Sequence, residues 1–423
     1  MSGIKVSRRT MLTALGLGAT TALSGCGGGS DDDDGLSSSS SERLDKVLEE
    51  AVAAEDAPFL VAAVSDRNGV IWQGAAGQAN ASLPASQDVV FAIFSATKAI
   101  GSLAAMILLD RGQVTLETKV ADVLPEYGAF QVLESIGPSG PVLRPPATPV
   151  TLRQLLTHTN GQGYALWNQK QLDFQNSTTP PTPGGYDQPL MFDPGTGWTY
   201  GTGIDWAGFM VEKIDGRSID QFVQEEIFGP LRMNDTVFEK DSVASRLAMP
   251  RSRGEDGKFT DSPGLGPEPR PERYGMGGCL YGTTLDYLKF LRLVLNDGLV
   301  DGRRILSSNA VKLMKENQIG SLRIPFPTVT TNPATSAGLD LFPGAGVPCT
   351  HTSAFVRNEI DVPERRRAGS LTWAGLANTH YWVDTASGIA AVLFSQHLPF
   401  IEPRFVNVYA TFEKAVYREL SRD

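Results

Sequence analysis

Apolar residues recur along the chain with different spacings, and each spacing predicts a kind of element. In residues 41–53 they recur every three or four positions, which is typical of a helix with one buried face. Short apolar runs at 59–64 and 70–73 flank the polar residues 66–69, and this order predicts a β-hairpin. Residues 95–110 are apolar almost throughout, so they are expected to form a helix that is buried on all sides.

The middle of the chain, at about 113–270, combines predicted helices with long loops rich in Pro and Gly. One of these loops, at 169–189, is long enough in a compact domain to be functional. Strand patterns return at 380–384 and 389–394, and a closing helix is expected at 405–420. We therefore expect an α/β (α+β) fold, in which one antiparallel sheet is built from both chain ends, helices flank it, and the middle is inserted as a mainly helical lobe.

The start of the chain carries signals for export. Arg8 and Arg9 precede a mostly apolar stretch that is too short to span a membrane, and this order resembles a twin-arginine export signal. The stretch ends at residues 23–26 with Leu-Ser-Gly-Cys, which resembles a bacterial lipobox, where Cys26 is lipidated and becomes the new N-terminus. An ordinary signal peptide with an incidental cysteine is the alternative. We expect an exported protein, in the periplasm or the cell envelope, held to the membrane by a lipid on Cys26.

Composition supports a division into three segments. Residues 27–40 are rich in Gly, Ser and Asp and cannot bury apolar surface, so they are expected to be a flexible tether. The tether would join a signal peptide at 1–26 to a folded domain at 41–423. Hydrophobic residues make up 41% of the chain, which is enough for a sizeable core. The net charge of −10, without a basic cluster, argues against a nucleic-acid partner.

Three cysteines are present, and two of them, Cys279 and Cys349, lie in the expected folded domain. They could pair in an oxidising periplasm. Twin-arginine substrates usually cross the membrane already folded, which disfavours late pairing and favours a free buried thiol at Cys279. Neither the cysteines nor the four histidines have the spacing of a metal or redox motif, so no metal and no cofactor are expected.

Residues 95–98 form the motif S-x-x-K, with Ser95 and Lys98 three positions apart on the predicted buried helix. Positions three apart face the same side of a helix, so the Lys98 amine can lie beside the Ser95 hydroxyl. A serine hydroxyl needs an adjacent base to act as a nucleophile, and burial lowers the pKa of a lysine so that it can be that base. A capping serine followed by a lysine that reaches solvent is the alternative. Because a lysine is costly in an apolar helix, we expect Ser95 to be the nucleophile and Lys98 its base.

Further segments carry motifs that occur together in one superfamily of enzymes. They are L-L-T-H-T-N-G at 155–161, P-G-T-G-W-T-Y at 194–200, F-G-P-L-R-M-N-D-T at 228–236, G-M-G-G followed by D-Y within 275–287, and L-T-W-A-G-L at 371–376. Together with S-x-x-K, these segments make the chain resemble the serine β-lactamase and penicillin-binding-protein superfamily, and specifically its class C-like esterase branch of W-G-G-type carboxylesterases. The resemblance covers about residues 45–420 and implies a β-lactamase-like fold.

The resemblance implies a role for Tyr200. The tyrosine would face Lys98 and carry the Ser95 proton to the leaving group; a core aromatic residue is the alternative. Class C β-lactamases have Y-x-N here, whereas this chain has Thr202 two residues after Tyr200, which weakens the β-lactamase interpretation more than the hydrolase one. The same resemblance implies that His158 is structural and not the base.

The resemblance also implies an oxyanion hole, a pair of donors that stabilises the charge on a tetrahedral intermediate. The donors would be the backbone N–H groups of Ser95 and Leu376. Trp373 and Gly375 belong to the motif that replaces K-T-G in such esterases, and Trp373 would offer the substrate a neutral aromatic wall. A glycine such as Gly375 permits close approach of the backbone to a ligand. An ordinary strand with a buried tryptophan is the alternative.

The resemblance implies an enzyme, and the motifs favour one activity over two others. We expect a carboxylesterase that cleaves small, mostly uncharged esters through an acyl-enzyme on Ser95. A β-lactamase or D,D-peptidase is the first alternative, and Trp373 in place of the K-T-G lysine argues against it. A non-catalytic binding lipoprotein is the second, and the joint presence of Ser95, Lys98 and Tyr200 argues against it. The expected partner is a small-molecule ester, and the sequence specifies no oligomeric state.

Cys26→Ser is expected to abolish the attachment of a labelled fatty acid and to move the protein out of the detergent phase, because the lipid would be bound to the Cys26 thiol. The measurement is metabolic labelling with phase partitioning in a bacterial host. Cys349→Ser serves as the control and should keep the label. A wild-type protein that takes up no label would show that residues 23–26 are not a lipobox.

Overall fold

The computed structural model describes residues 35–177, 185–326, 328–338, 340–342 and 346–422. Residues 35–423 form one compact unit. The expected signal peptide, Cys26 and the expected tether as far as residue 34 lie outside the described residues. Within the described part, no helix is long and apolar enough to cross a membrane.

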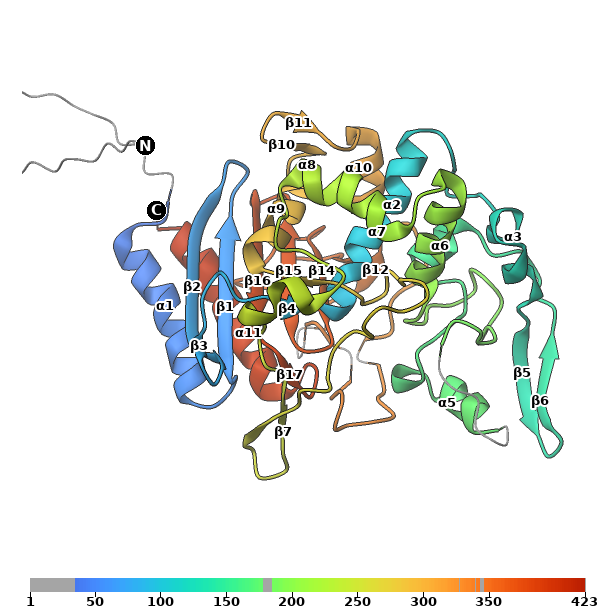
Figure 1. Ribbon diagram of the computed structural model, residues 1–423, viewed down its shortest axis with the longest axis horizontal. Helices are drawn as coiled ribbons and strands as arrows, with labels where there is room; N and C mark the ends of the chain where they lie inside the picture. Colours follow the sequence, from blue (N-terminus) through green and yellow to red (C-terminus); the bar gives the residue numbers. More distant parts are fainter. Residues whose placement is uncertain (1–34, 178–184, 327, 339, 343–345, 423) are drawn as a thin grey trace, which may run out of the picture. The chain divides into compact units, whose positions relative to one another are not determined.

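The described residues contain a main antiparallel sheet of eight strands in the order β12-β13-β14-β15-β16-β1-β2-β3 (Figure 1). The strands are β1 (Phe59–Ser65), β2 (Val70–Asn80), β3 (Leu83–Pro84), β12 (Cys349–His351), β13 (Val356–Asn358), β14 (Leu371–Gly375), β15 (Thr379–Asp384) and β16 (Ile389–Phe394). The two chain ends meet where β1 pairs with β16, with Val61 opposite Phe394. The predicted sheet from both chain ends is thus confirmed.

Helices α1 (Ser38–Ala53) and α11 (Pro403–Leu420) cover one face of this sheet (Figure 1). Their apolar faces pack with β1, β2, β15 and β16 in a cluster that includes Leu48, Trp382 and Phe412. The first helix begins three residues earlier than expected, with Ser37 as its N-cap. Ser40 is buried and its hydroxyl lies 3.3 Å from the Glu419 carboxylate, so the last residues of the expected tether are folded.

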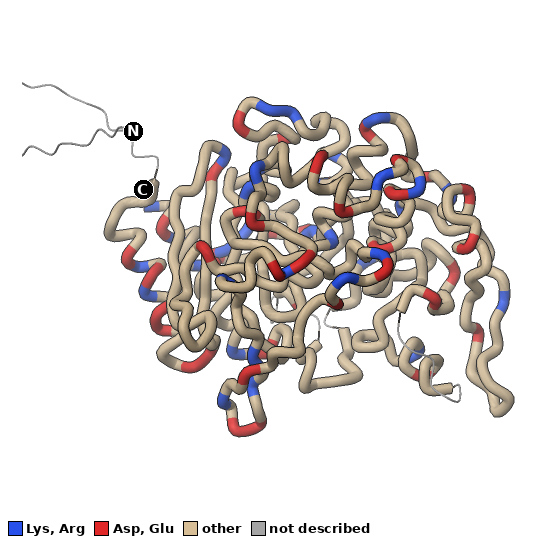
Figure 2. The backbone as a smooth tube through the Cα atoms, in the orientation of Figure 1, with Lys and Arg blue, Asp and Glu red and all other residues tan. Residues whose placement is uncertain are grey.

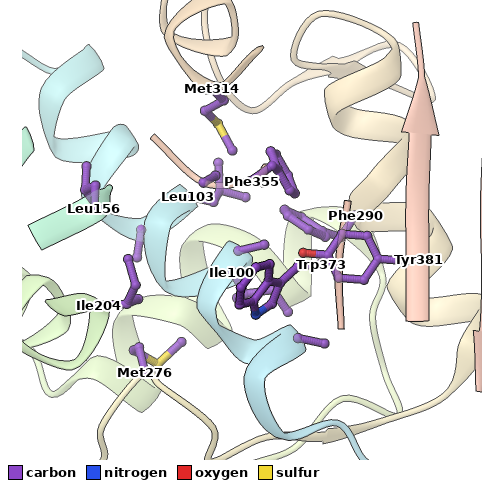
Figure 3. Packing of buried hydrophobic residues seen from close by; sticks show 14 of the residues in the cluster. Ile100, Leu103, Leu156, Ile204, Met276, Phe290, Met314, Phe355, Trp373 and Tyr381 are labelled. Carbon is purple, nitrogen blue, oxygen red and sulfur yellow. The ribbon is translucent and has the colours of Figure 1, made fainter. Parts of the chain in front are cut away.

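The other face of the sheet carries α9 (Thr284–Leu295) and, beyond it, the helix α2 (Thr97–Asp110). The predicted all-round burial of α2 is confirmed, since every residue from Thr97 to Leu108 is buried. Figure 3 shows Ile100 and Leu103 of α2 in one cluster with side chains of α9, β14 and β15. Because α2 also packs against α6 (Gly203–Asp215), it joins the sheet to the middle of the chain.

The middle of the chain is less regular than the sequence pattern suggested. It contains a hairpin that was not predicted, β5 (Val132–Gly137) and β6 (Gly140–Arg144), and a helix α5 (Gln169–Asn176) where a loop was expected. The remaining helices are α3 (Val120–Val123), α4 (Leu152–Leu156), α7 (Ile219–Val223), α8 (Gly229–Leu231) and α10 (Ser308–Lys315). The remaining strands are β4 (Phe91–Ala92), β7 (Arg251–Arg253), β8 (Phe259–Asp261), β9 (Tyr281–Gly282), β10 (Leu299–Val300), β11 (Arg303–Arg304) and β17 (His397–Leu398).

Charged residues are dispersed over the fold. Figure 2 shows Lys and Arg interspersed with Asp and Glu along the described part of the chain. Many arginines are paired locally; Arg217, for example, bonds to Asp215, Glu225 and Glu226. This distribution offers no basic track for a nucleic-acid backbone.

A buried ion pair fixes α11 to the loop before β14. Glu413 and Arg366 are fully buried, and Glu413 accepts bonds from Arg366 Nε at 2.7 Å and from Arg365 Nε at 2.6 Å.

Glu413→Gln should lower the free energy of unfolding by about 3–5 kcal/mol, because it leaves buried guanidinium groups without a counter-charge. Urea unfolding measures this. Lys414→Ala breaks an exposed pair with Glu364 and should change stability by less than about 1 kcal/mol. Equal effects of the two substitutions would contradict the role of the buried pair.

Candidate active site

Ser95 lies in a 3₁₀ turn, Phe94–Ala96, directly before α2. The preceding residue, Phe94, has a positive φ of 43°, a strained conformation for a bulky side chain that is often found at functional sites. Thr379 donates from its hydroxyl to the Ile93 carbonyl at 3.1 Å, which ties this turn to β15. A Cβ at Gly375 would collide with the same Ile93 carbonyl, so glycine is required for β14 to approach the turn. The close approach involves the protein's own backbone and brings the end of β14 beside Ser95.

Ser95 opens onto a cavity of about 610 Å³. The described lining is mostly apolar or aromatic and includes Phe94, Tyr164, Trp167, Tyr186 and Leu376. The predicted loop at 169–189 contributes to the described lining with Gln175, Gly185, Tyr186 and Gln188, and residues between 267 and 279 contribute a second part. Ser95 and Leu376 therefore face one cavity, as the predicted oxyanion hole requires.

Lys98 is buried beside this cavity, with only 4% of its surface exposed. Its ammonium donates to the Gly277 carbonyl at 2.6 Å and to the Tyr164 hydroxyl at 3.1 Å. It also lies 4.9 Å from the centre of the Tyr200 ring and 5.0 Å from that of Tyr164. The ammonium is thus enclosed by two phenol rings and a peptide carbonyl.

The expectation that Lys98 has a lowered pKa is wrong. Burial by itself acts in that direction, but Tyr164, Tyr200 and Asp205 together outweigh it and raise the pKa of Lys98 well above that of a free lysine. An ammonium with hydrogen-bond acceptors on two sides and a carboxylate nearby keeps its proton. Lys98 is therefore charged at neutral pH and does not fit the role of a resting-state base.

Tyr200 lies where the motifs placed it, against Lys98, and its hydroxyl accepts the indole N–H of Trp373 at 3.3 Å. The Trp373 ring packs against the Tyr200 ring with centroids 4.8 Å apart. Trp373 is 5% exposed and does not belong to the described cavity lining. The expectation that Trp373 forms the substrate wall is therefore corrected: its ring lies behind Tyr200, because β14 buries this side chain in the core.

Two residues of the site were missed in the sequence. Tyr164 lines the cavity and binds Lys98, and Asp205 is a buried carboxylate that accepts the Gly277 N–H at 2.6 Å. The position of Tyr164, three residues after the motif at 155–161, was one available signal. The other was an aspartate in the first turn of an otherwise apolar stretch at 203–211.

His158 lies behind Tyr200, with the two rings 5.0 Å apart. Burial, together with His351 and Lys98, lowers its pKa well below the usual value, so the ring is neutral. Its Nδ1 is 3.5 Å from the Gly201 N–H and accepts a long bond from it. This geometry gives His158 a packing role beside the segment that carries Tyr200.

The two cysteines of the described part do not pair. Cys349 is buried, and Cys279 is partly exposed and lines the cavity. Burial raises the pKa of the Cys279 thiol, and Asp205 raises it further, so the thiol is protonated at neutral pH. The described residues include no cluster of three or more His, Cys, Asp or Glu side chains that could hold a metal ion.

Trp373→Phe keeps a ring behind Tyr200 and removes only the indole N–H. Because a neutral hydrogen bond contributes about 0.5–1.5 kcal/mol, we expect the rate at which a phosphonate labels Ser95 to fall roughly 2- to 12-fold. Trp198→Phe is the matched control, since the buried indole nitrogen of Trp198 has no partner among the described residues. An equal loss in both variants would show that the bond to Tyr200 is without effect.

Comparison with known proteins identifies the family of the chain. The family model described as Beta-lactamase matches residues 44–415. The chain is 30% identical over 365 residues to the lovastatin esterase of Penicillium rubens, over 80% of this chain and 87% of that protein. It is 28% identical over 364 residues to a monacolin J acid methylbutanoyltransferase of Aspergillus terreus, over 79% and 84% of the two chains. A mutant of simvastatin synthase from Aspergillus terreus has a similar structure, with a TM-score of 0.78 and 26% identity, over 92% of this chain and 99% of that one. The chain therefore belongs to the Beta-lactamase family and is an enzyme of the serine-hydrolase type with a β-lactamase-like fold.

Proposed function

We propose that this enzyme cleaves or transfers carboxylic esters through an acyl-enzyme on Ser95. The observation that carries the proposal is the position of Ser95 at a mostly apolar cavity of about 610 Å³, one helical turn from a buried, charged lysine. A serine nucleophile, a proton carrier and a polarising charge are the elements that acyl transfer requires. The names of the two relatives, an esterase and an acyltransferase, point the same way.

The proposed reaction begins when the Ser95 hydroxyl attacks the ester carbonyl carbon and gives its proton to the Tyr200 oxygen. The Lys98 ammonium beside the ring stabilises the phenolate from which this step starts. The backbone N–H groups of Ser95 and Leu376 stabilise the negative oxygen of the tetrahedral intermediate. Tyr200 then returns the proton to the departing alcohol, and water or a second alcohol releases the acyl group by the same steps in reverse.

The charge of the cavity favours uncharged esters. Among the described lining residues, Arg273 is the only Lys or Arg, and its Nε lies 2.5 Å from Glu212. Its guanidinium also lies 3.8 Å from the centre of the Phe209 ring. A substrate carboxylate near Ser95 would thus meet no free cation of the described lining, which disfavours β-lactams and D,D-peptides. The preference for uncharged esters thus follows from the charge of the lining and not from Trp373, which does not belong to it.

The size of the cavity extends the expected range of substrates. Cavities of roughly 300–1,000 Å³ hold drug-sized ligands, so an ester of a bulky apolar alcohol fits as well as a small ester. The same space can hold an alcohol that accepts the acyl group in place of water. Acyl transfer is therefore the second activity that we propose for the same site.

For the location of the enzyme we propose the cell envelope, because residues 8–9 resemble a twin-arginine export signal and residues 23–26 resemble a lipobox.

A serine-directed phosphonate is expected to label Ser95 alone, and Ser95→Ala should abolish both the label and the hydrolysis of p-nitrophenyl butyrate. Lys98→Ala and Tyr200→Phe should each lower the rate by ~10²-fold or more, the range of acid–base contributions, with effects that do not add. Ser102→Ala is the control, because this buried serine lies on the same helix and its hydroxyl has no partner among the described residues. Hydrolysis of nitrocefin at the rate of the neutral ester would refute the proposed preference.

A further inference from the structure

Asp205 is a buried carboxylate at the site for which the steps above assign no role. It is 4% exposed and lies in the first turn of α6. Its side chain accepts the Gly277 N–H at 2.6 Å rather than forming an ion pair within the described residues. A carboxylate without a direct cationic partner is costly in a protein interior, and the N-terminus of a helix offsets only part of that cost. The cost suggests that the charge is used.

Gly277 connects this carboxylate to the catalytic lysine. Its N–H points to Asp205, and its carbonyl accepts the Lys98 ammonium at 2.6 Å. A Cβ at Gly277 or at Gly275 would collide with the Asp205 carboxylate, so both glycines are needed for the loop to pass this closely. Asp205 and Lys98 thus lie on two sides of one glycine residue, which fixes the distance between the two charges.

The loop itself is held firmly. Met276, between the two glycines, is fully buried and packs against Gly101 and Gly208, on helices α2 and α6. Figure 3 shows Met276 next to Ile204 of α6. Since the same two helices carry Lys98 and Asp205, neither charge can move away without disturbing the core.

We propose that Asp205 is a positioning residue that acts through Gly277 to hold Lys98 in place as an ammonium throughout the reaction. This inference rests on the proposed function of the site. Lys98 then stabilises the tyrosine phenolate by its charge and does not itself remove the Ser95 proton. Asp205 contributes by keeping the positive charge on Lys98 beside the Tyr200 ring.

Other titratable groups face Lys98 and bear on its charge. They are Tyr164, Tyr200, Tyr186, His158 and Cys279. His158 is neutral, and burial keeps the Cys279 thiol and the Tyr186 phenol protonated by raising the pKa of each. Asp205 is therefore the carboxylate among the groups that raise the pKa of Lys98.

The test compares the pH dependence of kcat/KM in the wild type and in Asp205→Asn, with p-nitrophenyl butyrate as the substrate. The amide keeps an oxygen that can accept the Gly277 N–H and loses only the charge. Because the pKa of Lys98 lies well above that of a free lysine, the wild type should show no alkaline limb up to the highest pH at which it stays folded. Asp205→Asn should lose activity within that range, since one opposite charge at close range shifts a pKa by ~1–3 units. Asp286→Asn is the control, because Asp286 is also a buried carboxylate in the first turn of a helix and accepts one backbone N–H, that of Asp235 at 2.7 Å, but lies away from the cavity and pairs with Lys289; its profile should not move.

Two results would overturn the proposal. One is an Asp205→Asn profile that, like that of the wild type, shows no loss of activity at high pH. The other is an acidic limb that moves to lower pH while the rate at neutral pH rises, since this is the behaviour of a lysine that acts as a neutral base. Failure of the proposed function is separate, because it would appear as a wild type with neither ester turnover nor phosphonate label on Ser95.

Lys98→Arg provides a second test that does not depend on the folding of an Asp205 variant. Arginine stays charged at all accessible pH values. If Lys98 works as an ammonium, Lys98→Arg should keep measurable activity above that of Lys98→Met and, like the wild type, should show no alkaline limb. Activity of Lys98→Arg equal to that of Lys98→Met would contradict the inference.

Discussion

The charge of Lys98 is the constraint on which the site depends. An ammonium in an apolar interior is tolerated only where hydrogen-bond acceptors and negative charge surround it. Here a peptide carbonyl, a phenol oxygen, two aromatic faces and a carboxylate one residue away meet that need. These groups come from three parts of the chain, at 164, 200–205 and 277, all far from Lys98 in sequence, so the charge can be stable only after the fold has formed.

The sheet provides the fixed side of this arrangement. Its central strands are buried on both faces, so their positions relative to α2 are set by close packing. The end of β14 reaches the turn that carries Ser95 because Gly375 has no side chain to keep the two backbones apart. Trp373, two residues earlier on the same strand, fills the space behind Tyr200 and orients its hydroxyl. Strand β14 therefore supports both the turn that carries Ser95 and the side chain of Tyr200.

The middle of the chain provides most of the aromatic side chains that line the cavity. Tyr164, Trp167 and Tyr186 line the cavity with rings, and Arg273, its one described cation, is paired with Glu212. A mostly apolar lining of this kind strengthens the interaction of the Lys98 charge with negative charge that develops on the Tyr200 oxygen. It also gives an apolar alcohol a place to bind beside the acyl group, which connects hydrolysis and acyl transfer to one geometry.

The sequence by itself determined the sheet from both ends, the buried helix and the family, because apolar spacing and short motifs are local properties of the chain. It also placed Ser95 and Lys98 on one side of a helix turn. Only the tertiary structure decided which residues surround Lys98, since Tyr164, Asp205 and Gly277 lie far from it in sequence and no local pattern joins them. For the same reason the Lys98 pKa and the orientation of Trp373 differ from expectation: burial could be predicted from composition, whereas the partners that reverse its effect are brought together by packing.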